Sequence, residues 1–127
     1  MTRLVRNDAC QTGRMIVAFS VSPSGDRPAE AGHAPSGVAA DSVHEAVAAA
    51  VKIVRESGLP NRTSSMFTEI EGEWDEVMDV VRRATEAVGR YGTRVSLVLK
   101  ADIRPGHSGE IEGKVERLER AIAEQSG

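Results

Sequence analysis

The chain has 127 residues, of which 28% are charged, and a formal net charge of −3. This length suffices for one domain with a hydrophobic core, and no apolar run approaches the roughly 20 residues of a membrane-spanning helix. Because cationic residues are dispersed and aromatic residues make up only 3%, we expect neither nucleic acid nor a membrane as a partner. Cys10 is the single cysteine, which excludes an internal disulfide and is typical of a cytoplasmic protein.

The beginning of the chain predicts a polar extension followed by a strand. Residues 1–14 have no apolar periodicity, and we interpret them as a disordered or flexible extension of a single domain over residues 15–127. The run MIVAFSV, which begins at Met15, predicts a β-strand. A stretch rich in proline, glycine and alanine follows between Gly25 and Asp41 and predicts a long loop.

The first helix has clear signals at both ends. Ser42 with Glu45 three residues later predicts a capping box, in which each side chain satisfies a backbone N–H of the first turn. Gly58 is suited to the left-handed position after the helix, and Pro60 prevents its continuation. We expect the buried face to consist of apolar residues at helical spacing: Val43, Val47, Ala50, Val51 and Val54.

A hairpin and a second helix are expected next. The hairpin has strands at about 61–65 and 67–71, with a turn near Ser65 and Met66. The helix is predicted from about Glu73 to Arg90, since acidic residues favour a helix N-terminus and Gly92 follows its end. Its expected buried face comprises Trp74, Val77, Met78, Val81, Ala84 and Val88.

The last third of the chain predicts a strand and a short amphipathic helix. Over residues 93–103 one face is apolar, and the opposite face carries Ser96, Val98, Lys100 and Asp102. After a turn at Pro105 and Gly106, helical spacing relates the apolar residues Ile111, Val115, Leu118 and Ile122.

This order of elements, β-α-β-β-α-β with a trailing helix, predicts an α+β fold of the ferredoxin-like type. That fold has a four-stranded antiparallel sheet with two helices on one face, here with an added C-terminal helix. The other sheet face would present Ile16, Ala18 and Ser20 with Val98. Because a partly apolar open face is usually covered, we expect a homo-oligomer with a ligand pocket at the interface or the sheet end.

Two groups of polar residues are candidates for ligand contacts. Glu69 and Glu71 share the uncovered face, where they would bind a cationic or hydrogen-bond-donating ligand. Alternatively, Glu71 and Glu73 would merely favour the start of the second helix. Sequence chemistry alone favours the second interpretation. Lys100, Asp102 and Arg104 form either a ligand-facing stripe or the solvated side of an edge strand, and the edge position slightly favours the latter.

The histidines do not indicate catalysis or a metal site. His33, His44 and His107 have no cysteine, histidine or carboxylate at the spacing of zinc ligands, so we expect no metal. Cys10 lies in the predicted extension, which makes nucleophilic catalysis through it improbable.

Several strings resemble the YkoF-like thiamine-binding protein family. They are Met15–Ser20, Ser57–Leu59, Met66–Gly72 and Lys100–Arg104, with Lys114 downstream. The most specific is the Met-x-Thr-x-x-Glu-Gly signature within Met66–Gly72. The resemblance extends from Met15 to nearly the C-terminus. It implies a ferredoxin-like protein that forms dimers or tetramers through its sheets, binds thiamine or its hydroxymethylpyrimidine part, and catalyses no reaction.

Carried over to this sequence, the resemblance implies a ligand site of Thr68 and Glu71, with Ser20 and Asp102 in support. Phe67 stands where many relatives have glycine, and we expect it to narrow the pocket or to provide an aromatic wall. The long loop from Gly25 to Asp41 is a second departure from the family pattern. It leaves the identity of the ligand open.

Two other functions remain possible at this point. One is a small ferredoxin-like enzyme without a cofactor, which would need a titratable residue in an apolar pocket, and His44 is the passable candidate. The other is a regulatory module whose open sheet face binds another protein. A pocket lined by Thr68, Glu71 and Ser20 would favour ligand binding over both.

Overall fold

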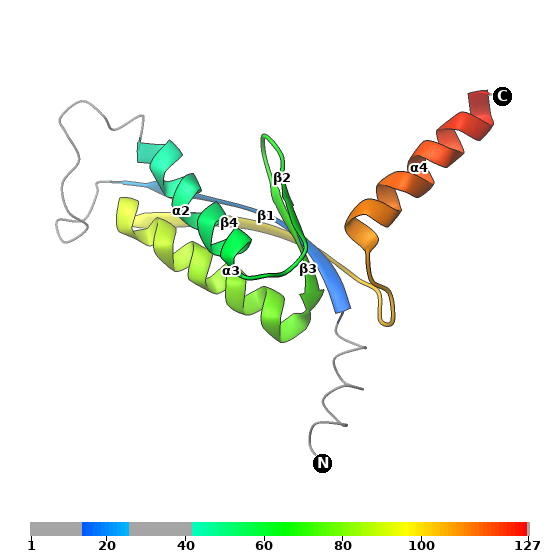
Figure 1. Ribbon diagram of the computed structural model, residues 1–127. Coiled ribbons are helices and arrows are strands. Elements are labelled where there is room, and N and C mark those ends of the chain that lie inside the picture. Colours follow the sequence, from blue (N-terminus) through cyan, green and yellow to red (C-terminus); the bar gives the residue numbers. More distant parts are fainter. Residues whose placement is uncertain (1–13, 26–41, 127) are drawn as a thin grey trace, which may run out of the picture.

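The computed structural model describes residues 14–25 and 42–126, which form one antiparallel sheet and its helices (Figure 1). In chain order the elements are β1 (Arg14–Ser24), α2 (Ser42–Glu56), β2 (Asn61–Thr63), β3 (Thr68–Glu73), α3 (Trp74–Val88), the 3₁₀ turn η2 (Gly89–Tyr91), β4 (Arg94–Ile103) and α4 (Glu110–Ser126). The strand order across the sheet is β2-β3-β1-β4. The predicted ferredoxin-like βαββαβ fold with a C-terminal helix is confirmed.

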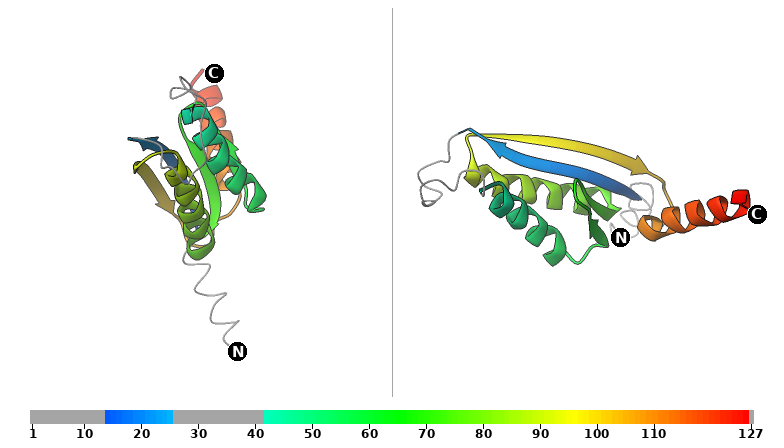
Figure 2. Two further views of the ribbon diagram at one scale, coloured as in Figure 1. Left: turned by 90° about the vertical axis from the view of Figure 1, so that its left-hand side faces the viewer. Right: turned by 90° about the horizontal axis from the view of Figure 1, so that it is seen from above.

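The molecule has two layers and one projecting helix. Figure 2 shows α2 and α3 together on one side of the sheet, whereas α4 extends beyond the end of the strands. Both α2 and α3 contact β1 and each other, so the hydrophobic core lies between these helices and the sheet. None of the described helices forms a layer over most of the opposite sheet face, as the element order predicts.

Alternation along β1 places its apolar residues on the two faces as expected. Val17 and Phe19 are buried against the helices, and Ile16, Ala18 and Ser20 point to the open face. The residues of β4 alternate between the same two faces, because they pair in antiparallel register with those of β1, but on this edge strand Leu97 and Ile103 stay 42% and 47% exposed. The core combines residues of β1, β3, α2 and α3: Met15, Val17, Phe19, Val21, Ala46, Ala50, Val54, Ile70, Val77, Val80, Val81, Ala84 and Val88.

The expected buried faces of α2 and α3 are wrong at their first turns. Val43 and Val47 are 43% and 40% exposed, since α2 turns Ala46 rather than these valines toward the core. Trp74 is 48% exposed because it is the first residue of α3, where the helix has only begun to lie against the sheet. The sequence pattern predicts the helical period correctly, but it does not specify which residues of the first turns face the core.

The element boundaries differ slightly from the predictions. β2 ends at Thr63 instead of 65, and the hairpin is closed by a hydrogen bond that Ser64 N donates to Phe67 O at 2.9 Å. Gly58 adopts a φ of +83°, a left-handed conformation that glycine accommodates without strain, and it follows α2 as expected.

Some predictions concern parts of the chain outside the described residues. The predicted extension lies outside the described residues except for Arg14, which begins β1. The predicted long loop with His33 also lies outside them. The side chain of Ser42, and with it the capping box, also lies outside them. Among the helices that are described, none has both the length and the apolar character to cross a membrane.

Two valines of α2 provide a matched test of the core. Val54 is fully buried and Val43 is 43% exposed. We expect Val54→Ala to lower the free energy of unfolding by about 2 kcal/mol, because it removes buried methyl groups and leaves a cavity. Val43→Ala should change it by less than about 0.5 kcal/mol. Urea unfolding monitored by circular dichroism measures both, and equal losses would contradict the orientation of α2.

Candidate functional site

The open face of the sheet carries two rows of side chains that run across three strands. In one row Ala18 of β1 lies between Glu69 of β3 and Lys100 of β4. In the next row Ile16 lies between Glu71 and Asp102. Residues paired across antiparallel strands project to the same side, so each row places an apolar floor between charged flanks.

Glu71 is the residue that anchors α4 to this face. Its side chain is buried, and the residue is 1% exposed. Both carboxylate oxygens accept a hydrogen bond from the backbone N–H of Glu110 at 3.0 Å, and Oε1 also accepts one from Ile111 N at 3.4 Å. Arg14 Nη2 lies 3.9 Å from Oε2. A carboxylate in this position satisfies unpaired N–H groups at a helix N-terminus and is favoured by the helix dipole.

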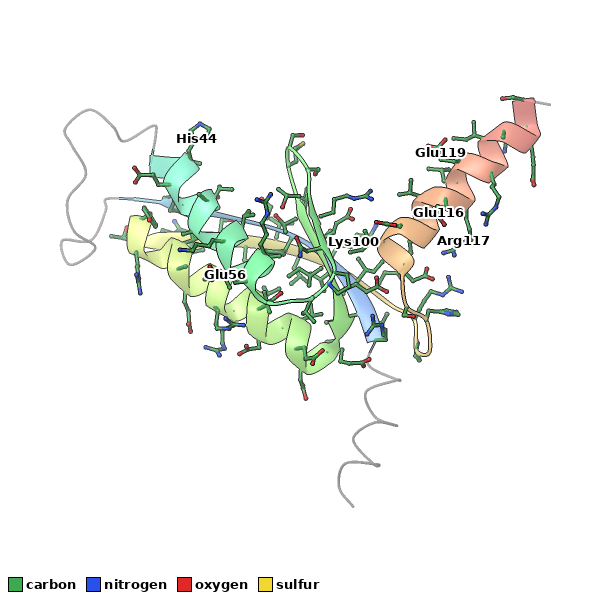
Figure 3. All side chains as sticks on the ribbon, viewed as in Figure 1. His44, Glu56, Lys100, Glu116, Arg117 and Glu119 are labelled. Atoms are coloured by element: carbon green, nitrogen blue, oxygen red, sulfur yellow. The ribbon has the colours of Figure 1, made fainter. Side chains whose placement is uncertain are left out.

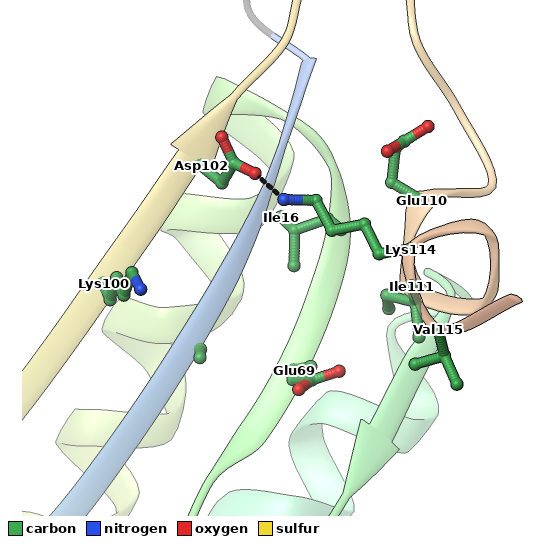
Figure 4. A pocket seen from close by; sticks show the side chains of 9 residues that line it. Ile16, Glu69, Lys100, Asp102, Glu110, Ile111, Lys114 and Val115 are labelled. Atoms are coloured by element: carbon green, nitrogen blue, oxygen red, sulfur yellow. Dashed lines mark hydrogen bonds and ion pairs between the residues drawn. The ribbon is translucent and has the colours of Figure 1, made fainter. Parts of the chain in front are cut away.

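The first turns of α4 thereby form a wall above the open face. A cavity of about 220 Å³ lies between that wall and the sheet (Figure 4). Its lining residues come from β1, β3, β4 and α4: Ile16, Ala18, Glu69, Lys100, Asp102, Glu110, Ile111, Lys114 and Val115. Ile16 and Ala18 form the apolar floor on the central strand, and Ile111 with Val115 adds apolar surface from α4.

Two of the acidic groups in this cavity are already neutralised. Lys114 Nζ donates a hydrogen bond to Asp102 Oδ2 across the cavity, and this bond holds the pKa of Asp102 below its usual value (Figure 4). Arg117 Nη2 donates to Glu110 Oε1 at 2.7 Å and lowers the pKa of Glu110. Arg104 Nη1 lies 3.8 Å from the same oxygen. Both carboxylates are therefore held ionised by neighbouring cations.

Glu69 and Lys100 differ from these pairs. Within residues 14–25 and 42–126, neither side chain forms an ion pair or a hydrogen bond. They flank Ala18 from opposite sides, so the cavity presents one free hydrogen-bond acceptor and one free cationic donor on opposite walls.

A second cavity lies on the other side of the start of α4. Its volume is about 240 Å³, and its lining residues are Pro60, Asn61, Arg62, Glu71, Gly109, Ile111 and Glu112. Because Ile111 lines both cavities, the first turn of α4 separates them. The second cavity contains the anchoring carboxylate, whose oxygens are occupied by the backbone of α4.

The five residues that the sequence suggested do not meet in one place. Asp102 lines the first cavity, and Glu71 holds α4 between the two cavities. Ser20 lies on the open face opposite Val98, one row beyond the first cavity. Thr68 is buried on the helix side of β3, where it pairs with Phe19, and Phe67 is half-buried in the hairpin turn. Thr68 and Glu71 thus face opposite sides of the sheet and cannot contact one small ligand together.

Glu69 and Lys100 were candidates for ligand contacts in the sequence, but neither was among the five chosen site residues, and Lys114 was not chosen either. Glu69 and Lys100 occupy the expected face, but an exposed charge on a strand has no feature that marks it as a cavity residue. Lys114 is on α4, whose position depends on the bond between Glu71 and backbone N–H groups. A prediction of the strand register, combined with the alternation of side chains between the two sheet faces, would have placed Glu69 and Lys100 in one row.

Neither of the described histidines lines this cavity, although His107 lies close enough to Glu110 to contribute to lowering the pKa of that carboxyl. His44 is exposed at the start of α2, far along the molecule from the labelled Lys100 (Figure 3). In the part of the chain that the structure describes, no three histidine, cysteine or acidic residues form a cluster suited to a metal ion.

Comparisons with solved structures agree on the fold. A domain of unknown function, DUF77, from Bacillus cereus superimposes with a TM-score of 0.61 at 27% identity, covering 80% of this chain and 88% of that one. A putative thiamine biosynthesis/salvage protein from Thermotoga maritima gives a TM-score of 0.62 at 24% identity, with coverage of 83% and 98%. The second likeness establishes a shared fold.

Comparisons of sequence establish the family. UPF0045 protein Mb1933 of Mycobacterium bovis is 46% identical over 109 residues, which cover 85% of this chain and 94% of that protein. UPF0045 protein sll0230 of Synechocystis is 35% identical over 79 residues, or 61% of this chain and 65% of that protein. The family model described as thiamine-binding protein matches residues 29–119. The resemblance seen in the sequence motifs is thus confirmed, and the chain belongs to the thiamine-binding protein family.

Proposed function

We propose that this protein binds thiamine or its hydroxymethylpyrimidine part in the cavity between α4 and the open sheet face, and that it catalyses no reaction. The observation that carries this proposal is the combination of an apolar floor with a free carboxylate, Glu69, on one wall. Family membership supports a small ligand of this kind. The name of the Thermotoga maritima protein points to the same vitamin.

The aminopyrimidine ring of thiamine suits this arrangement chemically. It is flat and would lie on Ile16 and Ala18, which offer an even apolar surface on the central strand. Its exocyclic amino group is a hydrogen-bond donor, and a carboxylate such as Glu69 makes a strong, charge-assisted acceptor for it. Asp102, the predicted site residue at the end of the neighbouring row, borders the ring from β4.

The size of the cavity indicates that a second copy of the chain completes the site. Pockets for drug-sized ligands usually measure about 300–1,000 Å³, and the 220 Å³ found here suits a single ring better than two. We therefore propose that thiamine also contacts a neighbouring protomer. Ser20 and Phe67 lie outside the cavity, and a contact between them and the ligand stays a prediction.

Exposed apolar residues on α4 and on the open sheet face support such an assembly. On α4, Val115, Leu118 and Ile122 are 42%, 57% and 47% exposed, and Val98 on the open face is 56% exposed. The three α4 residues share a face at helical spacing. Val115 also borders the cavity, whereas no part of the described chain covers Leu118 and Ile122. We propose that α4 and the open face of one protomer pack on a second copy in a dimer or tetramer.

The charges of the two surfaces are compatible with this packing. Arg62, Arg94 and Lys100 leave the open face with an excess of positive charge over Glu69. The part of α4 beyond its first turns carries Glu116, Glu119 and Glu124. Arg117 is paired with Glu110, so Arg120 alone offsets these three, and this part of the helix has a net negative charge. Opposite net charges favour association between copies over repulsion.

Titration calorimetry with thiamine tests the ligand. We expect a dissociation constant on the order of micromolar, since few polar contacts are available. Glu69→Gln should weaken binding about tenfold, because the amide is an uncharged and therefore weaker acceptor. Glu56→Gln is the matched control at the exposed end of α2, and its affinity should equal that of the wild type. The proposal fails if millimolar thiamine produces no binding heat.

Light scattering after size-exclusion chromatography tests the assembly. We expect the wild type to elute as a dimer or tetramer, and Leu118→Glu to shift it toward the monomer, because a buried charge on the apolar stripe of α4 would be unpaired. Arg120→Glu introduces the same residue on the opposite side of the helix and should leave the assembly intact. A monomeric wild-type protein would refute this part of the proposal.

A further inference from the structure

The candidate cavity contains a cation that thiamine itself would not use. Of its two lysines, Lys114 is paired with Asp102. Lys100 forms no salt bridge among the described residues, although it lies close enough to Asp102 to contribute to lowering the pKa of that carboxyl. Thiamine carries a permanent positive charge on its thiazolium ring. An ammonium group on the wall of the cavity would repel that charge or remain unused.

We propose that the cavity prefers a phosphate monoester of thiamine to thiamine itself, with Lys100 binding the phosphate. This inference rests on the proposed function, because it specifies the chemical form of the ligand in the same cavity. The phosphate group is an anion with several acceptor oxygens. A lysine ammonium is a compact cation with three donors, a common partner for phosphate in proteins.

The row of residues across the sheet gives the ligand a direction. Glu69 and Lys100 lie on strands that flank β1, so their backbones are separated by two strand spacings, about 10 Å. With the aminopyrimidine directed to Glu69, the other end of the ligand points to β4. Because the cavity suits one ring, the thiazolium ring and its phosphate-bearing arm would extend beyond it past β4, where the flexible and exposed side chain of Lys100 can follow them.

The carboxylates nearby do not cancel this preference. Asp102 is hydrogen-bonded to Lys114, and Glu110 is bound by Arg117 with Arg104 close by. Their negative charges are therefore offset before a ligand arrives. Glu69 is the cavity carboxylate without such a partner within the described chain, and it occupies the opposite wall. The β4 side of the cavity is thus the side with unbalanced positive charge.

Parallel calorimetric titrations with thiamine, thiamine monophosphate and inorganic phosphate test the inference on the full-length protein. We expect the monophosphate to bind about tenfold more tightly than thiamine in dilute buffer, with the advantage shrinking as salt is raised. In Lys100→Met the ratio of the two affinities should fall to about one. Lys52→Met, an exposed lysine of α2 outside the cavity, should retain the wild-type ratio.

The outcomes distinguish a failure of this inference from a failure of the proposed thiamine-binding function. If thiamine binds as tightly as its monophosphate, or if Lys100→Met keeps the wild-type ratio, the phosphate preference is refuted and the thiamine site stands. If neither compound binds, both proposals fail together. If inorganic phosphate alone competes as strongly as the monophosphate, Lys100 belongs to a simple anion site and the inference is refuted.

Discussion

The arrangement of this protein depends on one buried carboxylate. Glu71 is removed from water on the open side of the sheet, which would destabilise an ionised group without partners. The first backbone N–H groups of α4 supply those partners, and the guanidinium of Arg14 lies nearby. The helix N-terminus and the carboxylate satisfy each other, because the helix end needs hydrogen-bond acceptors and the carboxylate needs hydrogen-bond donors. This mutual requirement fixes where α4 begins.

The position of α4 in turn creates the candidate site. A ferredoxin-like sheet by itself offers an open and nearly flat face. Once the first turns of α4 stand over that face, Ile111 and Val115 oppose the floor of Ile16 and Ala18, and a cavity forms between them. The remainder of α4 extends away from the domain, as Figure 1 shows, and its apolar side chains are exposed. One interaction therefore links the ligand site to the surface that we propose for assembly.

The sequence predicts the fold well because local signals agree with one another. Strand alternation around Val17 and the glycine after α2 each specify one backbone conformation, and the order of elements leaves few topologies. The site is less predictable. Glu71 was identified as important, but its partners are backbone groups 39 and 40 residues away, which no side-chain pattern reveals. Thr68 shares a motif with Glu71 yet faces the helices, since strand neighbours three apart in sequence lie on opposite faces.

Hydrogen exchange of the α4 backbone measures the central interaction most directly. We predict that the amides of Glu110 and Ile111 are protected in the wild type and exchange at least about tenfold faster in Glu71→Ala, because their acceptor is gone. Amides of β1 and β4 report whether the sheet remains folded, and Glu69→Ala provides a control on the same strand and face without touching Arg14. Unchanged protection of both α4 amides in Glu71→Ala would contradict the account, because something other than this carboxylate would then hold the helix over the cavity.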